Sequence, residues 1–149
     1  MIMRLATVTL TAVVLATGSM NLSSSPPSVK FEELSKSSTG WDGQPFTYPA
    51  GEAELTMMRV TMNAGSTIPL HCHPVPVIAY VISGELEVTK PNGETVRYLA
   101  KHGKIEVFRQ LHKGVAVEDT EIIVIYAGAK DQPNTILQSD QPAGSDSCG

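Results

Sequence analysis

The sequence predicts an all-β protein, a closed barrel or two-sheet jelly roll, in a single domain. Three observations predict this class. Short strand-like segments follow one another at regular spacing from residue 53 onward, glycine-containing turns separate them, and no segment of useful length has helical periodicity. The length of 149 residues, with 42% hydrophobic content, suits one core rather than two.

The individual strands are predicted from apolar and polar side chains that alternate, or from compact apolar runs. The clearest turn is Asn92-Gly93, because this dipeptide is typical of a tight hairpin. A second turn is expected at residues 100–103. The predicted strands are residues 54–62, 77–82, 85–89, 95–99, 104–108 and 121–126.

The N-terminus has the pattern of a secretory signal peptide. Arg4 precedes a short apolar run, and Ala16 lies at a plausible cleavage site. The run is shorter than the roughly 20 apolar residues that span a bilayer, so we expect no membrane span and a periplasmic or secreted protein. A retained anchoring segment is the alternative. The expected organisation is a signal peptide (1–20), a linker and N-terminal arm (21–44), a barrel (45–130) and a C-terminal tail (131–149).

Charge narrows the class of partner. The chain has 11 Lys and Arg against 15 Asp and Glu, a net charge of −4, without a basic cluster. Such a balance argues against nucleic-acid binding. The sequence also lacks the Gly-x-Ser-x-Gly nucleophile motif of one class of hydrolases. The expected partner is a small-molecule ligand held in the pocket of the barrel.

Three histidines are the candidate metal ligands. His71 and His73 share one face if they lie in a strand, and a neighbouring strand could bring His112 beside them. Neutral imidazole is a common ligand of divalent Fe, Mn, Ni, Cu and Zn. The alternative is a structural histidine cluster that holds no metal. His102 lies in a turn and is expected to be exposed.

The spacing of the first two histidines resembles the first motif of the cupin superfamily, G-x5-H-x-H-x3,4-E-x6-G. Gly65, His71, His73 and Gly84 match it, and Val77 stands at the position of the glutamate ligand. The resemblance covers roughly residues 45–130. It implies a double-stranded β-helix barrel, and homodimers in which residues 30–52 could take part.

The second cupin motif, G-x5-P-x-G-x2-H-x3-N, is matched at His112. Val107, Arg109 and Ala116 stand where proline, glycine and asparagine are usual. The superfamily includes dioxygenases, isomerases, decarboxylases, lyases, storage proteins and sugar-binding regulators, so the fold alone does not choose a function. A three-histidine set resembles that of its thiol and diketone dioxygenases.

Glu106 is the candidate catalytic residue. If its carboxylate faces the interior, it could replace the missing ligand or act as a general base beside the metal. The alternative is a solvated glutamate, because Ile105 and Val107 would share the opposite face of a strand and form the core pair. Arg97 and Arg109 are further candidates to orient a polar group.

Further expectations concern apolar and sulfur-containing side chains. Val77, Ile78, Val81 and Ile123 are expected to line the pocket, and Met57, Met58 and Met62 to fill the core. Cys72 should face away from the histidines beside it, and we expect it to be free, because the Gly, Ser and Asp residues around Cys148 give that cysteine nothing to order it.

The function expected from these residues is that of an exported metal-dependent enzyme, dioxygenase-like, acting on a small organic molecule. The ligands would be His71, His73 and His112. The alternative is a barrel that binds a small ligand or a metal without turnover. The two differ in whether the bound metal keeps exchangeable positions open to a substrate.

Overall fold

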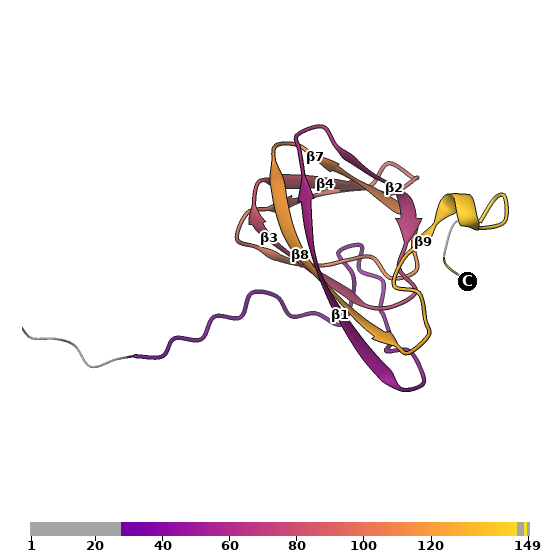
Figure 1. Ribbon diagram of the computed structural model, residues 1–149, viewed down its shortest axis with the longest axis horizontal. Helices are drawn as coiled ribbons and strands as arrows, with labels where there is room; N and C mark the ends of the chain where they lie inside the picture. Colours follow the sequence, from indigo (N-terminus) through magenta and orange to yellow (C-terminus); the bar gives the residue numbers. More distant parts are fainter. Residues whose placement is uncertain (1–27, 146–147, 149) are drawn as a thin grey trace, which may run out of the picture. The chain divides into compact units, whose positions relative to one another are not determined.

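The computed structural model describes residues 28–145 and Cys148, and its strands form two antiparallel sheets that face each other (Figure 1). The predicted all-β class is confirmed. The predicted signal peptide, residues 1–20, lies outside the described residues. Residues 28–31 belong to a unit separate from Glu32–Gly149, and they are exposed without regular secondary structure. Within the described part of the chain, no helix is long and apolar enough to cross a membrane.

The first sheet has four strands in the order β1-β8-β3-β6. Its long central strand β8 pairs with β1 along ten residues and with β3 on its other side. The bounds are Ala53–Met62 (β1), Thr120–Ala129 (β8), Val77–Ser83 (β3) and Gly103–Ile105 (β6).

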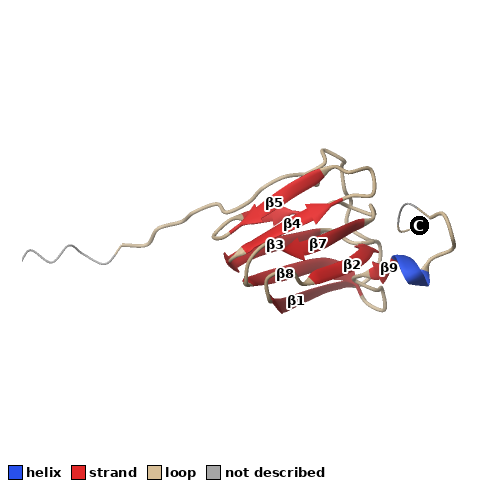
Figure 2. Cartoon of the chain, turned by 90° about the horizontal axis from the view of Figure 1, so that it is seen from above, coloured by secondary structure: helices blue, strands red, loops and turns tan. Residues whose placement is uncertain are grey.

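The second sheet has five strands in the order β5-β4-β7-β2-β9. Figure 2 shows the strands from above, with β9 beside the short helix η1 near the C-terminus. The bounds are Thr95–Leu99 (β5), Glu85–Thr89 (β4), His112–Ala116 (β7), Thr67–Cys72 (β2), Ile136–Leu137 (β9) and Gln138–Asp140 (η1).

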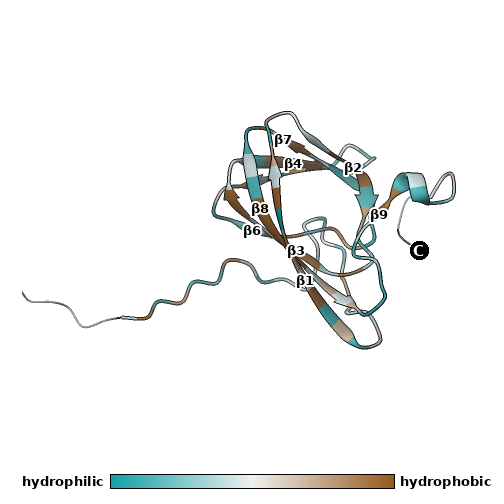
Figure 3. Cartoon of the chain, in the orientation of Figure 1, coloured by the Kyte–Doolittle hydropathy of each residue, from teal (hydrophilic) through white to brown (hydrophobic). Residues whose placement is uncertain are grey.

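The core lies between the sheets, where alternate residues of each strand point inward. Along β8 the side chains of Ile122, Val124 and Tyr126 are buried, whereas Ile123 and Ile125 are partly exposed. Apolar colour therefore follows the strands in Figure 3. This packing leaves the central part of the barrel lined by aliphatic side chains.

Gly84 makes the tight connection between β3 and β4. Its φ is +81°, and a Cβ at this position would overlap the carbonyl of Asp119 and come within 2.5 Å of Thr120 Oγ1. Both the left-handed backbone and the close approach require glycine here. The conformation explains why a glycine ends the histidine motif.

The predicted core role of three methionines is wrong in part. Met57 and Met58 are 68% and 47% exposed and do not fill the core, whereas Met62 is buried.

The predicted pocket lining is wrong for all four side chains. Val77 and Val81 are buried in the core but do not line the cavity beside the histidines. Ile78 and Ile123 lie on the outer face of the first sheet, because along β3 and β8 the side chains before and after them point inward.

The prediction that Cys72 is free is also wrong. Cys72 and Cys148 form a disulfide with their Cα atoms 5.9 Å apart. The C-terminal segment is ordered by contacts with distant residues: β9 pairs with β2, and the Cys148 N–H donates to the Arg109 carbonyl at 3.0 Å. Both sulfur-bearing side chains are buried with Leu111, so local Gly, Ser and Asp content is a poor guide to order here.

Candidate metal centre

An irregularity in β2 turns His71 into the barrel. Ile68 pairs with Gly114 and His71 pairs with His112, so three steps along β2 match two along β7. This β-bulge lets Ile68 and His71 both line the interior, although they are three positions apart and would face opposite sides of a regular strand. Pro69 lies in the bulge, where a residue without an N–H is tolerated.

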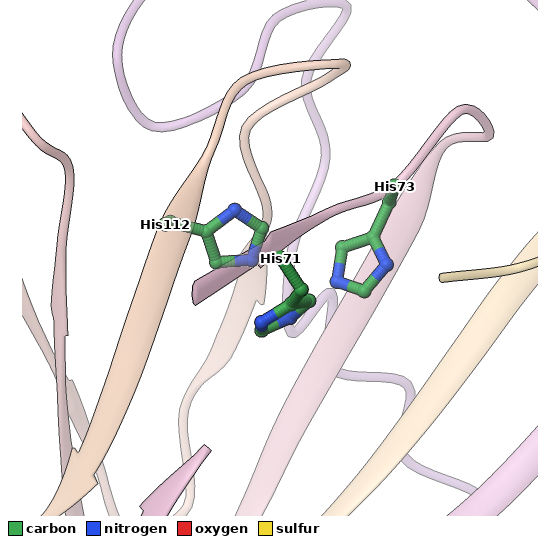
Figure 4. Close-up of side chains that lie close together, drawn as sticks. All are labelled: His71, His73 and His112. Carbon is green, nitrogen blue, oxygen red and sulfur yellow. The ribbon is translucent and has the colours of Figure 1, made fainter. Parts of the chain in front are cut away.

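The side chains of His73 and His112 also point into the barrel, close to His71. His73 directly follows Cys72, the last residue of β2. The side chain of Cys72 points away from the two histidines beside it, as predicted from strand alternation. His112 is the first residue of β7, directly across from His71. All three rings are at least 95% buried and face one another in Figure 4. One ring nitrogen from each lies within 4.8 Å of the others.

Backbone carbonyls fix which ring nitrogen faces the centre. The Nδ1 atoms of His71, His73 and His112 lie 2.6, 2.9 and 2.9 Å from the carbonyl oxygens of Pro69, Asn134 and Gln110. A carbonyl oxygen only accepts, so each Nδ1 carries the hydrogen and each neutral ring presents an Nε2 lone pair. This arrangement is typical of histidines that bind a metal through Nε2.

Glu106 adds a carboxylate to the three rings. Its Oε2 lies 3.2 Å from His73 Nε2 and 3.3 Å from His112 Nε2, and the residue is 8% exposed. The solvated alternative rested on strand alternation, but β6 ends at Ile105, one residue earlier. Ile105, Glu106 and Val107 are therefore all buried, and the carboxylate faces the histidines.

These atoms form a set of acceptors without a donor between them. The buried Nε2 of His112 has no hydrogen-bond partner among the described residues, although Glu106 is near. Lone pairs and a carboxylate in such proximity require a cation, either a proton or a metal ion. Ligands about 2.0–2.2 Å from one ion lie roughly 3.0–3.4 Å apart, and the Glu106 separations fall in this range. The donor set therefore fits a divalent ion.

Burial and mutual contact shift the pKa values of the site in opposite directions. Burial, reinforced by His112 and His73, lowers the pKa of His71 to about 4. Burial also opposes ionisation of Glu106 and His112, but their contact outweighs it: the pKa of Glu106 is lowered and that of His112 is raised.

The metal centre opens into a cavity of about 170 Å³ between the sheets. Among the described residues that line it, none is Lys or Arg, and the polar groups outside the metal centre are Tyr126 and Thr135. The aliphatic lining comes from both sheets: Val60, Ile68, Leu86, Val88, Ile122 and Val124. A ligand thus meets the metal centre at one end and hydrocarbon elsewhere.

The remaining candidates lie outside this cavity. Arg97 contacts Glu85 and Glu87 on an exposed face, and neither Arg97 nor Arg109 lines the cavity. His102 is exposed, as predicted. Arg109 has a φ of +59°, which explains why glycine is usual at its position in the second cupin motif.

Two contributors to the site carry no local sequence signal. The carbonyl of Asn134 and the hydroxyl of Thr135 both contact His73 Nδ1, the latter at 3.2 Å. They belong to the segment predicted as a tail. Their role depends on long-range pairing that the sequence pattern does not indicate.

No protein-family model matches the sequence, and no curated protein matches it. Solved structures do resemble the chain. DMSP lyase DddQ from Ruegeria pomeroyi aligns over 67% of this chain and 49% of its own, with TM-score 0.51 and 22% identity. KdgF from Halomonas sp. aligns over 55% and 76%, with TM-score 0.47 and 26% identity.

An RmlC-like cupin protein from Desulfovibrio desulfuricans aligns over 54% of this chain and 76% of its own, with TM-score 0.45 and 19% identity. The chain spans about half the length of the DMSP lyase. The two-sheet barrel agrees with the likeness to the DMSP lyase, the one of these three with a TM-score above 0.5. The chain therefore shares the two-sheet β-barrel fold of that lyase.

Proposed function

We propose that the protein is a metal-dependent enzyme that acts on a small organic molecule. The observation that carries the proposal is the convergence of three buried imidazoles whose Nδ1 hydrogens are all held by backbone carbonyls. His71, His73 and His112 would hold the ion, with Glu106 as a fourth ligand or as a base beside it. Fe, Mn, Ni, Cu and Zn all accept such donors, so the metal is named here only as a divalent ion.

The proposed chemistry depends on the charges at the site and on the access of a substrate to it. A divalent ion in this site supplies a Lewis-acidic centre with positions open to substrate. Glu106 is ionised and 8% exposed, so it can accept a proton from a molecule held against the histidines. Tyr126 lines the same cavity and packs edge-on against His73 at 5.4 Å between ring centroids, which keeps that ring in place.

The cavity favours a substrate with one polar end and an apolar body. A space of about 170 Å³ holds roughly six to ten non-hydrogen atoms, since a cavity of similar size binds benzene. A second charged group would lie against the aliphatic lining without a counter-ion, which is costly. The proposed substrate is therefore neutral or carries a single anionic donor.

Dioxygenase chemistry is the proposed reaction class. Histidine and carboxylate ligands with open positions are typical of non-haem Fe(II) oxygenases. The test is oxygen consumption by the Fe(II)-loaded protein with small monocarboxylates, thiols and diketones, with anaerobic conversion measured in parallel. Conversion that needs no oxygen would replace the dioxygenase with a lyase or isomerase.

A matched set of variants separates the enzyme from a non-catalytic barrel. Alanine at His71, His73 or His112 should each abolish metal retention, whereas His102→Ala should leave it intact. Ligand binding without any turnover across the substrate panel would favour the binding barrel. Equal metal loss in all four variants would contradict the ligand assignment.

Export to the periplasm or the medium is also proposed. The N-terminal pattern of Arg4 and an apolar run supports it, and so does a disulfide, which persists in oxidising compartments. Mass spectrometry of the protein from separated cell fractions tests this. A full-length chain confined to the cytoplasm would contradict it.

A homodimer is also proposed. Leu55, Met57 and Ile78 are 76%, 68% and 38% exposed on the outer face of the first sheet. Adjacent exposed apolar side chains often mark an interface. Sedimentation equilibrium of the wild type and of Met57→Glu tests the proposal, and a monomer at all concentrations would contradict it.

A further inference from the structure

The three candidate ligands differ in what holds their rings. The Nδ1 hydrogens of His71 and His112 are donated to carbonyls two residues earlier in the chain. His73 instead donates to the carbonyl of Asn134, 61 residues later, and its Nδ1 also contacts the hydroxyl of Thr135. The orientation of one ligand thus depends on a segment remote in sequence.

Regular structure in that segment is short, and Asn134 at its start is held to β1 by its Nδ2, which donates to Thr56 Oγ1 at 3.0 Å. β9 contains two residues, Ile136 and Leu137, of which Leu137 is 39% exposed, and the short helix after it contains no buried residue. A two-residue strand pairing is marginal without further support. Further support comes from Gln141, whose Nε2 donates to Cys72 Sγ at 3.2 Å, and from the disulfide between Cys148 and Cys72, the residue between His71 and His73. The disulfide fastens the end of the segment to the strand that carries the ligands.

A second link runs through the loop before β7. The Cys148 N–H donates to the Arg109 carbonyl at 3.0 Å, and the Arg109 N–H donates to the His73 carbonyl at 2.9 Å. The C-terminal segment therefore reaches His73 from two sides, at its ring and at its backbone. His73 follows the end of β2, so strand pairing alone does not hold it.

We propose that the Cys72–Cys148 disulfide makes the C-terminal segment a positioning element of the metal centre, which fixes the ring of His73 through Asn134 and Thr135. Opening the disulfide releases this segment and weakens metal binding at His73, while the rings of His71 and His112 keep their local hydrogen bonds. The inference rests on the metal site of the proposed function. It makes metal retention dependent on the redox state of a disulfide outside the ligand set.

The test measures metal retention and ring state separately. Zn²⁺ release to a chelator is followed for oxidised wild type, for wild type reduced with a phosphine that is then removed under anaerobic conditions, and for Cys148→Ala. Release is expected to be at least about tenfold faster in the last two, which is the usual effect of losing a group that orients a ligand. Ser139→Ala, in the exposed part of the same segment, is the matched control and should behave as wild type.

Ring nitrogens are then observed by long-range ¹H–¹⁵N NMR of the metal-free protein. The hydrogen-bonded Nδ1–H signal of His73 should be lost on reduction, with those of His71 and His112 preserved. Thr135→Val removes one of the two contacts and should speed Zn²⁺ release by a smaller factor. If Cys148→Ala does not fold, the reduced wild type and Thr135→Val provide the same comparison.

The outcomes are distinct. Unchanged Zn²⁺ release and an unchanged His73 signal after reduction would overturn the inference. Equal loss of all three ring signals would also overturn it, because that result indicates general loosening. If the oxidised protein binds no metal, the proposed function fails, and the His73 signal still decides whether the disulfide positions the ring.

Discussion

Opening the Cys72–Cys148 disulfide is expected to lower the free energy of unfolding of the metal-free protein by about 4 kcal/mol. The two cysteines are 76 positions apart. Closing a loop of this length removes entropy from the unfolded chain that corresponds to about 4.5 kcal/mol at 25 °C in the chain-entropy description. With a urea m-value of about 2 kcal/mol/M for a domain of this size, the unfolding midpoint should fall by about 2 M.

The assay is urea unfolding followed by far-ultraviolet circular dichroism, with oxidised and reduced wild type compared after removal of metal. Reduction substitutes no residue, so the difference reports the cross-link together with the contacts that its opening releases, and the absence of metal excludes stabilisation by ligand binding. The urea midpoint of Cys148→Ala should lie near that of reduced wild type, under both oxidising and reducing conditions. Midpoints of oxidised and reduced wild type within about 0.3 M of each other would refute the reasoning.

Three further predictions concern the centre and one turn. Glu106→Gln keeps the size of the side chain but removes its charge, and should speed metal loss to a chelator by about 10- to 100-fold; an unchanged rate would place the carboxylate outside the metal's influence. The folded-state pKa of His71, about 4, lies below the ordinary 6.5, so the unfolded chain binds more protons between these values. The free energy of unfolding of the metal-free protein should therefore fall by up to about 3 kcal/mol from pH 6.5 to 4 because of this residue. In chemical denaturation, the free energy of unfolding of His71→Gln should depend less on pH than that of the wild type. An equal pH dependence in the two proteins would argue against this prediction. Gly84→Ala should cost more in thermal unfolding than Gly93→Ala, which has a similar positive φ but open space around it, by about 1 kcal/mol or more; equal losses would show that the clash is relieved.

The sequence was a good guide wherever the relevant rule was local. Alternation placed His71 and His73 on one face and Cys72 on the other, and the Asn92-Gly93 turn lies between β4 and β5. Alternation failed at Glu106 because the strand ends one residue before it. A side chain beyond the end of a strand follows the path of the loop, which no periodic pattern records.

The C-terminal segment was predicted incorrectly for a different reason. Its Gly, Ser and Asp content predicts little order, but the segment is paired with β2 and cross-linked to it. Asn134 and Thr135 contribute to the site through this pairing. Contacts between residues more than 60 positions apart depend on the assembled fold, so the tail could not be connected with His73 from composition.

The most direct test of the central claim is elemental analysis of the processed protein, purified without chelator or metal-affinity tag, beside its His112→Ala variant. Replacing His112 removes one of three converging Nε2 atoms and leaves Glu106 without one of its two partners. The account predicts near-stoichiometric Fe, Mn, Ni, Cu or Zn in the wild type and a marked loss in the variant. Little metal in either protein would contradict the metal centre and favour a barrel that binds small molecules without one.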